Sequence, residues 1–218
     1  MSAATATRRA AVPKMNRKRV IGVLVVVAII IGMGLDTTAV PIGSTGSQAN
    51  KFDPAKYGKA KFPAIQKAVQ NRAVPAKQLA SALAGDKSAA VDKYALAKGT
   101  FPVMAVKFSG VVGKGQLGTF HVKVDGVPDS LTIRVQTGPA ITGVVLRDSD
   151  PNIQFGDFVN QIQYQNAAAG INNAMKKKVL SGLDRDHLKG KTIRVVGAFQ
   201  LINPDNWMVT PVQISVQQ

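Results

Sequence analysis

The sequence contains neither cysteine nor glutamate among its 218 residues. The lack of cysteine excludes disulfides, thiolate nucleophiles and cysteine-ligated zinc or iron–sulfur centres. Because all 12 acidic residues are aspartate, helices cannot be stabilised by Glu-to-Lys pairs one turn apart. Histidine is nearly absent as well, since only His121 and His187 occur and neither has a second imidazole at ligand spacing. We therefore expect no metal site and no cofactor.

Several catalytic motifs are also missing. No glycine-rich loop precedes a helix with Lys-Ser or Lys-Thr, and no Gly-x-Ser-x-Gly occurs, so phosphate-loop and hydrolase chemistry have no support. Asp184 and Asp186 have a spacing that suits a hard cation, but Arg185 and Lys189 lie beside them and indicate a solvated loop. The sequence therefore predicts a protein without catalytic residues, not an enzyme.

The N-terminus has a long apolar run directly after a basic stretch. Residues 20–35, VIGVLVVVAIIIGMGL, carry no charged side chain, and six basic residues precede them: Arg8, Arg9, Lys14, Arg17, Lys18 and Arg19. Basic residues hold the preceding segment in the cytoplasm. We therefore predict a cytoplasmic basic tail over residues 1–19 and a membrane-inserting segment over residues 20–40.

Two interpretations of residues 20–40 remain open. A spanning helix needs about 20 apolar residues and a signal-peptide core about 7–15, and this run lies between the two. We favour an uncleaved single-pass transmembrane anchor, while the small residues Thr37 and Ala39 suit a cleaved signal. Both interpretations place the rest of the chain outside the cytoplasm, and the first predicts a cell-membrane protein with an extracytoplasmic C-terminal domain.

Residues 41–50 are small and polar and are typical of a flexible linker. A basic helical layer is predicted over residues 51–98, which hold ten basic and three acidic side chains. Asp53 followed by Pro54 is a helix-start signal. Pro63 and Pro75 are expected to divide the layer into short helices.

The apolar pattern changes from helical to alternating at about residue 101, which predicts strands. The alternating stretches are residues 104–108, 120–124, 131–135, 193–201 and 212–216. Asp125-Gly126 and the NPDN stretch at 203–206 are turn signals. Between the third and fourth strands, residues 157–183 have helical spacing, with a kink expected at Gly170.

Three strands, a helix and two further strands are the order of an OB-fold, a small barrel whose helix lies between its third and fourth strands. The predicted fold class is thus α+β. It consists of an OB-fold-like five-stranded barrel over residues 99–218, with preceding short helices and an N-terminal transmembrane helix. A barrel with a wet outside also explains why each strand has one apolar face. A generic α+β sheet is the second choice, because Ile141 and residues 144–146 suit an additional short strand.

Residues 138–164, GPAITGVVLRDSDPNIQFGDFVNQIQY, concentrate polar side chains. The candidate ligand-binding residues are Arg147, Asp148, Asp157, Asn160, Gln161 and Tyr164. Charged and amide groups beside aromatic rings suit a hydroxyl-rich ligand such as a sugar. The alternative, which we favour, is a structural brace, in which Arg147 pairs with Asp148 or Asp157 and Asp157 caps the following helix through Asn160.

The same stretch carries a family resemblance. The motifs GP, LRD, DF and NQI within it, followed by GLDRDHLKGKTIRVVGAF at 182–199 and TPV at 210–212, resemble the bacterial predicted periplasmic lipoproteins of the domain-of-unknown-function family 2291. The resemblance runs from about Phe52 to Val216. Such proteins tend to be encoded beside sugar ABC transporters, which implies an accessory envelope role. This chain departs from the pattern in having no cysteine for lipid attachment, which favours a peptide anchor, and in having Gln163 where an acid is expected.

The charge balance bears on partners. Residues 36–218 hold 22 basic and 12 acidic side chains, a net charge of +10 that attracts anionic partners. The predicted function is a membrane-anchored extracytoplasmic accessory protein, whose partners are the membrane and ABC transporter components or anionic envelope polymers. A weak polar-ligand or sugar-binding module is the alternative. An OB-type nucleic-acid binder is third, because the outward cations lack interleaved aromatic residues for base stacking; these cations are Lys107, His121, Lys123, Arg134 and Arg194.

Overall fold

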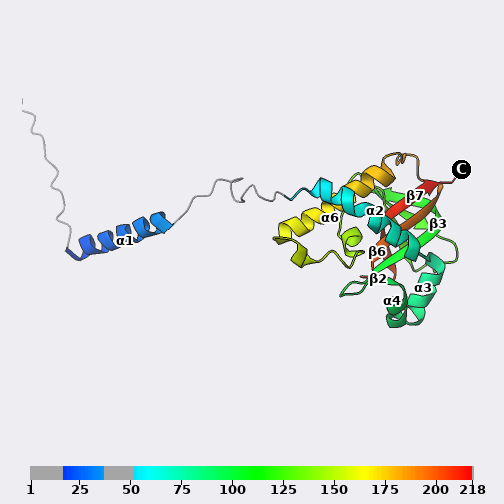
Figure 1. Cartoon of the computed structure of the whole chain (residues 1–218), viewed down its shortest axis with the longest axis horizontal. Helices are drawn as coiled ribbons and strands as arrows, with labels where there is room; N and C mark the ends of the chain where they lie inside the picture. The colour runs from blue at the N-terminus through cyan, green and yellow to red at the C-terminus, as the bar shows by residue number, and fades with distance from the viewer. Residues whose placement is uncertain (1–16, 37–51, 218) are drawn as a thin grey trace, which may run out of the picture. The chain divides into compact units, whose positions relative to one another are not determined.

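The computed structural model describes residues 17–36 and 52–217, which belong to two separate units, Met1–Lys51 and Phe52–Gln218 (Figure 1). In the first unit, α1 (Arg17–Asp36) is a helix whose apolar side chains are exposed from Ile21 to Ile31. Within the described ranges, no helix meets the length and hydropathy needed to cross a membrane. The predicted transmembrane anchor is therefore unconfirmed, and the predicted linker at 41–50 lies outside the described residues.

The second unit begins with the predicted basic helices. These are α2 (Pro54–Arg72), α3 (Ala76–Gly85) and α4 (Lys87–Tyr94). The predicted start of α2 is confirmed, because the Asp53 carboxylate accepts hydrogen bonds from the amides of Ala55 and Lys56 at 2.9 and 3.0 Å. Such a cap satisfies two of the amides that a helix start leaves without partners.

The effect predicted for Pro63 is wrong, whereas that predicted for Pro75 is confirmed. α2 continues through Pro63 to Arg72, and Pro63 lies on its exposed side. The carbonyl that loses its helical donor is that of Lys59, which is also exposed, so water can replace the missing bond. Pro75 ends the two-residue strand β1 (Val74–Pro75) immediately before α3.

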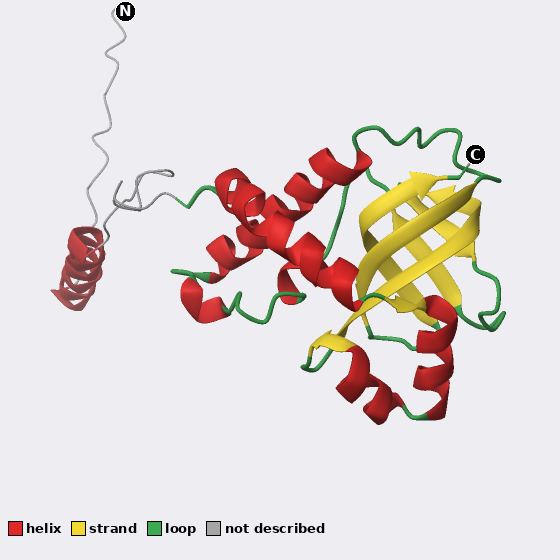
Figure 2. Cartoon of the chain, turned by 45° about the vertical axis from the view of Figure 1, so that its right-hand side comes forward, coloured by secondary structure: helices red, strands yellow, loops and turns green. Residues whose placement is uncertain are grey.

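Five long strands follow in the predicted order. They are β3 (Val103–Gln116), β4 (Thr119–Lys123), β5 (Thr132–Gln136), β6 (Thr192–Gln200) and β7 (Asn206–Val216). Their pairings run β3–β4–β5–β7–β6 and return to β3, and among these pairings only that of β5 with β7 is parallel. Figure 2 shows the strands together as one strongly curved sheet with helices beside it. The short strands β1 and β2 (Ala95–Ala97) also pair with β3.

β3 closes this circuit because it is long enough to have two partners. It pairs with β6 from Val103 to Val111 and with β4 from Val111 to Gln116. The change of partner falls next to Gly110, where a Cβ atom would overlap the carbonyl oxygen of Lys123. Glycine is suited to such a point, because another backbone approaches too closely for a side chain. The closed pairing leaves the long strands without a free edge where they meet.

Two apolar clusters stabilise the unit. The first lies on one face of the sheet, where Phe199 stacks on Trp207 with ring centroids 4.6 Å apart, and α3 contributes Leu79 and Leu83. The second lies on the opposite face, where α2 packs on β3, β6 and β7 and α6 packs on α2 and adds Ile171 and Met175 to the cluster. The predicted wet outside is therefore wrong for part of the sheet. In β3, residues 103–106 are all buried, because helices cover the second face.

The predicted helix over 157–183 is present but differs in its bounds. α6 runs from Gln161 to Met175 and continues as a π-helical turn, η3 (Lys176–Leu180). The helix passes through Gly170, where a kink was predicted, without interruption. Gly170 instead lies where α6 crosses α2: a Cβ atom on Gly58 would overlap the Gly170 carbonyl, and one on Gly170 would overlap the Pro54 carbonyl.

The additional strand suggested for residues 141–146 is also wrong. The structure has a short helix, α5 (Val145–Asp148), packed between α6 and β6. Val145, Leu146 and Arg147 are all buried. A strand with one wet face would expose the middle one of three consecutive side chains, whereas a single helical turn enclosed on several sides buries them all.

The helix crossing gives a testable prediction. We expect Gly170→Ala to lower the free energy of unfolding by about 1–3 kcal/mol, because the added methyl group forces α2 and α6 apart. Chemical denaturation measures the change. Gly85→Ala is the matched control, since Gly85 ends α3 and has open space around its Cβ position. A loss of stability at Gly85 as large as that at Gly170 would contradict the crossing account.

Candidate functional site

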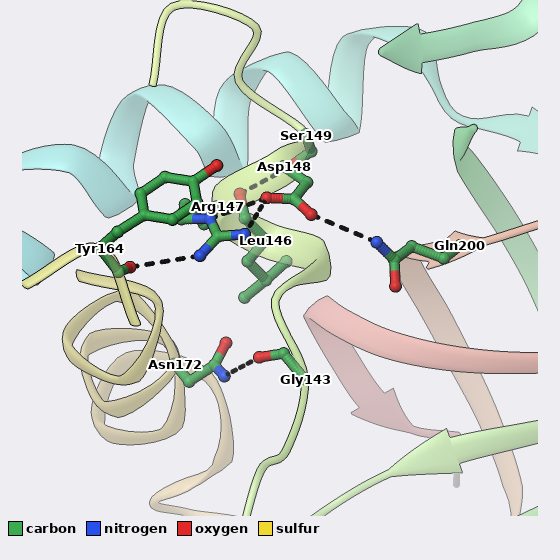
Figure 3. Close-up of polar contacts among 8 residues, drawn as sticks. All are labelled: Gly143, Leu146, Arg147, Asp148, Ser149, Tyr164, Asn172 and Gln200. Carbon is green, nitrogen blue, oxygen red and sulfur yellow. Dashed lines mark hydrogen bonds and ion pairs between the residues drawn. The ribbon is translucent and has the colours of Figure 1, made fainter. Parts of the chain in front are cut away.

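Arg147 is the centre of the polar stretch that the sequence singled out. It lies on α5 and is only 6% exposed. Its Nε donates to Oδ1 of Asp148 at 2.8 Å, and its NH2 group lies 2.6 Å from the same oxygen. Its NH1 group donates to the backbone carbonyl of Tyr164 at 3.2 Å (Figure 3). A single guanidinium therefore connects α5 to the first turns of α6.

Asp148 extends this connection to the sheet. Its second oxygen, Oδ2, accepts a hydrogen bond from the Gln200 side chain at the end of β6, at 3.2 Å (Figure 3). Of the two predicted ion pairs of Arg147, the one with Asp148 is thus the one that forms. Behind it, the hydroxyl of Ser149 donates to the Leu146 carbonyl at 2.7 Å. Both oxygens of the Asp148 carboxylate are engaged by protein donors.

The guanidinium of Arg147 also lies on an aromatic ring, with its Cζ 3.6 Å from the centroid of Tyr164. Such stacking satisfies the flat faces of a guanidinium whose edges already donate hydrogen bonds. Tyr164 belongs to an aromatic cluster that joins α6 to the start of α2; its members are Phe52, Tyr57, Phe155, Phe158 and Tyr164.

The environment of Tyr57 reflects the same crowding. Burial raises the pKa of its hydroxyl above the ordinary value, and the nearby carboxylates of Asp157 and Asp150 raise it further. Ionised Tyr57 would lie among carboxylates that repel it. Tyr57 contacts Phe52 and Phe158 in the cluster and serves there as a packing residue.

The remaining predicted site residues lie away from Arg147. The prediction that Asp157 caps the long helix is wrong: Asp157 ends the short 3₁₀ helix η2 (Phe155–Asp157) and accepts from the Gln154 amide at 2.9 Å. Asn160 itself caps α6, since its side chain accepts from the Gln163 amide at 2.9 Å. Gln161 is exposed. Local capping thus accounts for Asp157 and Asn160.

An open cavity of about 290 Å³ lies beside Asp148. Its polar lining comes from Lys98, Asp148, Asp150 and Gln200, and its flat apolar lining from Phe101 and Tyr164. Arg147, Asp157, Asn160 and Gln161 do not line it. Of the six predicted residues, the structure therefore brings Asp148 and Tyr164 to a cavity and places Arg147 behind them as their support.

Lys98, Phe101, Asp150 and Gln200 were not among the predicted site residues. Lys98 and Phe101 lie in the loop between β2 and β3, far from the polar stretch in the sequence. Only the pairing of β3 with β6 and the packing of α5 on β6 bring them together. Of these four residues, Asp150 is the one that the sequence could best have indicated as a site residue, because it lies only two residues after Asp148 in the polar stretch.

Arg185 differs from its predicted place in a solvated loop. It is only partly exposed, and its Nε donates to the Thr137 carbonyl at 2.6 Å while its NH2 group donates to the Leu180 carbonyl at 3.3 Å. The neighbouring Asp184 matches the prediction, since it is exposed and pairs only with His187 at 2.7 Å. That hydrogen bond lowers the pKa of the Asp184 carboxyl.

A second polar group lies near the end of β5. The buried Gln136 side chain donates to the Thr210 hydroxyl at 2.9 Å and accepts from the Thr142 amide at 3.1 Å. On the outer face of the sheet, Arg134 is half-buried and its NH2 group donates to the side-chain oxygen Oδ1 of Asn206 at 2.9 Å, so it is less free than the sequence suggested. Across residues 17–36 and 52–217, no group of three acidic or histidine side chains could hold a metal ion.

Comparisons with known proteins agree with the fold. The family described as predicted periplasmic lipoprotein (DUF2291) matches residues 23–215. A crystal structure of an OB-fold protein from Thermotoga maritima is similar to the chain, with 20% sequence identity and a TM-score of 0.59 over 77% of this chain and 100% of that one. At this identity the similarity concerns the fold alone, and it supports the predicted OB-like order of strands. No curated protein matches the sequence.

The contacts of Arg147 predict a structural role that mutation can test. We expect Arg147→Ala to lower the free energy of unfolding by about 3 kcal/mol, because Asp148 loses its buried partner. Asp157→Ala should cost about 1 kcal/mol through the lost capping contact. Tyr164→Phe is the control, since it keeps the ring on which the guanidinium stacks. Thermal and chemical denaturation give the three values, and three variants that melt like the parent would refute the brace.

Proposed function

Because the chain belongs to the family of predicted periplasmic lipoproteins (DUF2291), we propose that its folded unit works outside the cytoplasm as an accessory domain of the bacterial envelope. One observation carries the proposal. Six basic residues and the apolar run 20–35 precede a compact unit that begins at Phe52. A basic flank before an apolar run directs the following chain out of the cytoplasm.

The proposed mode of attachment is peptide rather than lipid. The chain lacks the cysteine to which a lipoprotein attaches its lipid, so residues 20–35 are left to hold it at the membrane. A cleaved signal is the alternative, and it would release the folded unit. The link to a sugar transporter stays a prediction that rests on the family resemblance.

We further propose that the domain acts by binding and not by catalysis. Arg147, the most buried charged group among the described residues, already contacts Asp148, the Tyr164 carbonyl and the Tyr164 ring. General acid–base catalysis needs a titratable group within reach of a substrate proton. The Asp148 carboxylate, which borders the cavity, already accepts from Arg147 and Gln200. These contacts favour a positioned hydrogen-bonding surface over a reactive one.

Fusion of a phosphatase reporter after Gln218 tests the export proposal. We expect an active reporter, because this enzyme folds to an active form only outside the cytoplasm. The size of the mature chain decides between anchor and signal: loss of the first ~39 residues would establish cleavage. A fusion lacking residues 20–35 is the matched control and should be inactive. A full-length fusion that is inactive although it is made would refute the export of this domain.

The cavity beside Asp148 supports a second candidate function, the binding of a small hydroxyl-rich ligand. Carboxylate and amide groups of Asp148, Asp150 and Gln200 can accept and donate hydrogen bonds to hydroxyls, while Phe101 offers a flat surface to the apolar face of a sugar ring. About 290 Å³ suits a ligand of the size of a monosaccharide or polyol.

A thermal-shift screen with monosaccharides and polyols tests this second function. A ligand at a hundredfold its Kd stabilises the folded state by about 2.7 kcal/mol, which is enough for a clear rise in Tm. Phe101→Ala should abolish that rise without lowering the basal Tm, because Phe101 is 50% exposed. Ile202→Ala, an exposed residue outside this cavity, is the control. A ligand whose effect survives Phe101→Ala binds elsewhere, and a screen without any stabilising ligand argues against the second function.

A further inference from the structure

Three large apolar side chains are exposed close together in the chain. Phe155 is 54% exposed, Val159 82% and Ile162 70%. They span η2 and the first turn of α6. Single exposed apolar residues are ordinary on a protein surface, but neighbouring ones mark contact surfaces. We refer to these three residues as the apolar patch.

The apolar patch lies beside the point where the chain enters the folded unit. Phe158, within the patch segment, has its ring 5.7 Å from that of Phe52 and 5.6 Å from that of Tyr57. Phe155 in turn contacts Tyr164 at 5.6 Å. Figure 1 shows the start of α2 and the start of α6 at the same end of the domain. The first residue of the domain and the patch are therefore neighbours.

The length of the preceding chain limits how far this end can be from the membrane. Only residues 37–51 separate the end of α1 from Phe52. Fifteen residues reach at most about 50–55 Å when fully extended. The proposed function places residues 20–35 in the membrane, and the inference rests on that placement. A short connection keeps the patch at a high effective concentration next to the lipid surface.

We infer that the apolar patch docks on the bilayer that holds the chain, with its three side chains inserted in the headgroup region. Apolar side chains of interfacial proteins enter the boundary between headgroups and acyl chains by about 5–10 Å. All three side chains of the apolar patch are uncharged. Apolar insertion therefore carries the contact, and neutral phosphatidylcholine is sufficient for it.

The lack of cysteine makes a direct test possible. In the full chain, Val159→Cys carries a single polarity-sensitive fluorophore, and the labelled protein is reconstituted in phosphatidylcholine vesicles. We expect emission at shorter wavelength than in detergent-free buffer, quenching by a lipid-borne quencher, and little change in molar salt. Ser88→Cys on α4 is the matched control, because Ser88 is also exposed but lies on another helix of the domain. Its emission should be unaffected by the quencher.

A second pair of variants tests whether apolar contact is the cause. Ile162→Asp should lower the ratio of docked to undocked domain at least about tenfold, because a large apolar side chain no longer leaves water. The fold should tolerate it, since an acidic side chain in the first turn of a helix is favourable. Leu117→Asp is the control: Leu117 is 90% exposed on the turn between β3 and β4 and has a φ of 51°, which aspartate accepts.

The outcomes separate this inference from the function on which it rests. Flotation of the unlabelled chain with the vesicles tests membrane attachment. A chain that floats while the Val159 probe reports water overturns docking and leaves attachment standing. A chain that does not float overturns both. A shift of the probe that depends on protein concentration and needs no vesicles shows a contact between two copies, and it also overturns docking on lipid.

Discussion

The pairing of one strand with two partners is the constraint on which the rest of the domain depends. β3 pairs with β6 along its first half and with β4 along its second half, so the strand pairings form a closed circuit. This closure sets the inner face, which holds Trp207 and Phe199, and leaves an outer face that α2 and α6 cover. Two helices can share that face because glycines let their backbones meet. Closure and helix crossing together determine where α5 lies.

The polar stretch on α5 follows from this arrangement. A single helical turn enclosed between α6 and β6 buries an arginine, and a buried guanidinium must have its donors satisfied. Arg147 meets this need through the Asp148 carboxylate and a carbonyl of α6, and Asp148 passes the contact on to β6. The side chains that remain available for a ligand are therefore those at the edge of the network, next to Phe101 and Asp150. Asp148 therefore belongs both to the brace, through its pair with Arg147, and to the lining of the cavity.

The strand order, the cap at Asp53 and the turns at Gly126 and residues 203–206 could be predicted, because each depends on a local pattern of apolar alternation or turn chemistry. The effects of Pro63 and Gly170 could not. Pro63 lies on the exposed side of α2, and Gly170 faces a helix more than a hundred residues earlier, so tertiary contacts decide both. The candidate site was half predictable for the same reason. The network around Arg147 is local in sequence, whereas Lys98, Phe101 and Gln200 reach the cavity only through strand pairing.

The parallel pair of β5 and β7 has a consequence for how the domain acquires its structure. Thr132 pairs with Asn206, and β7 ends only at Val216, so the last strand is needed to complete the sheet. Contacts between such distant segments form slowly, because a long loop must close before they stabilise the chain. If the chain leaves the cytoplasm N-terminus to C-terminus, the apolar strands β3 to β6 emerge before their final partner does. The sheet therefore cannot close until β7 is available to pair with β5 and β6, and until then the apolar strands lack this partner.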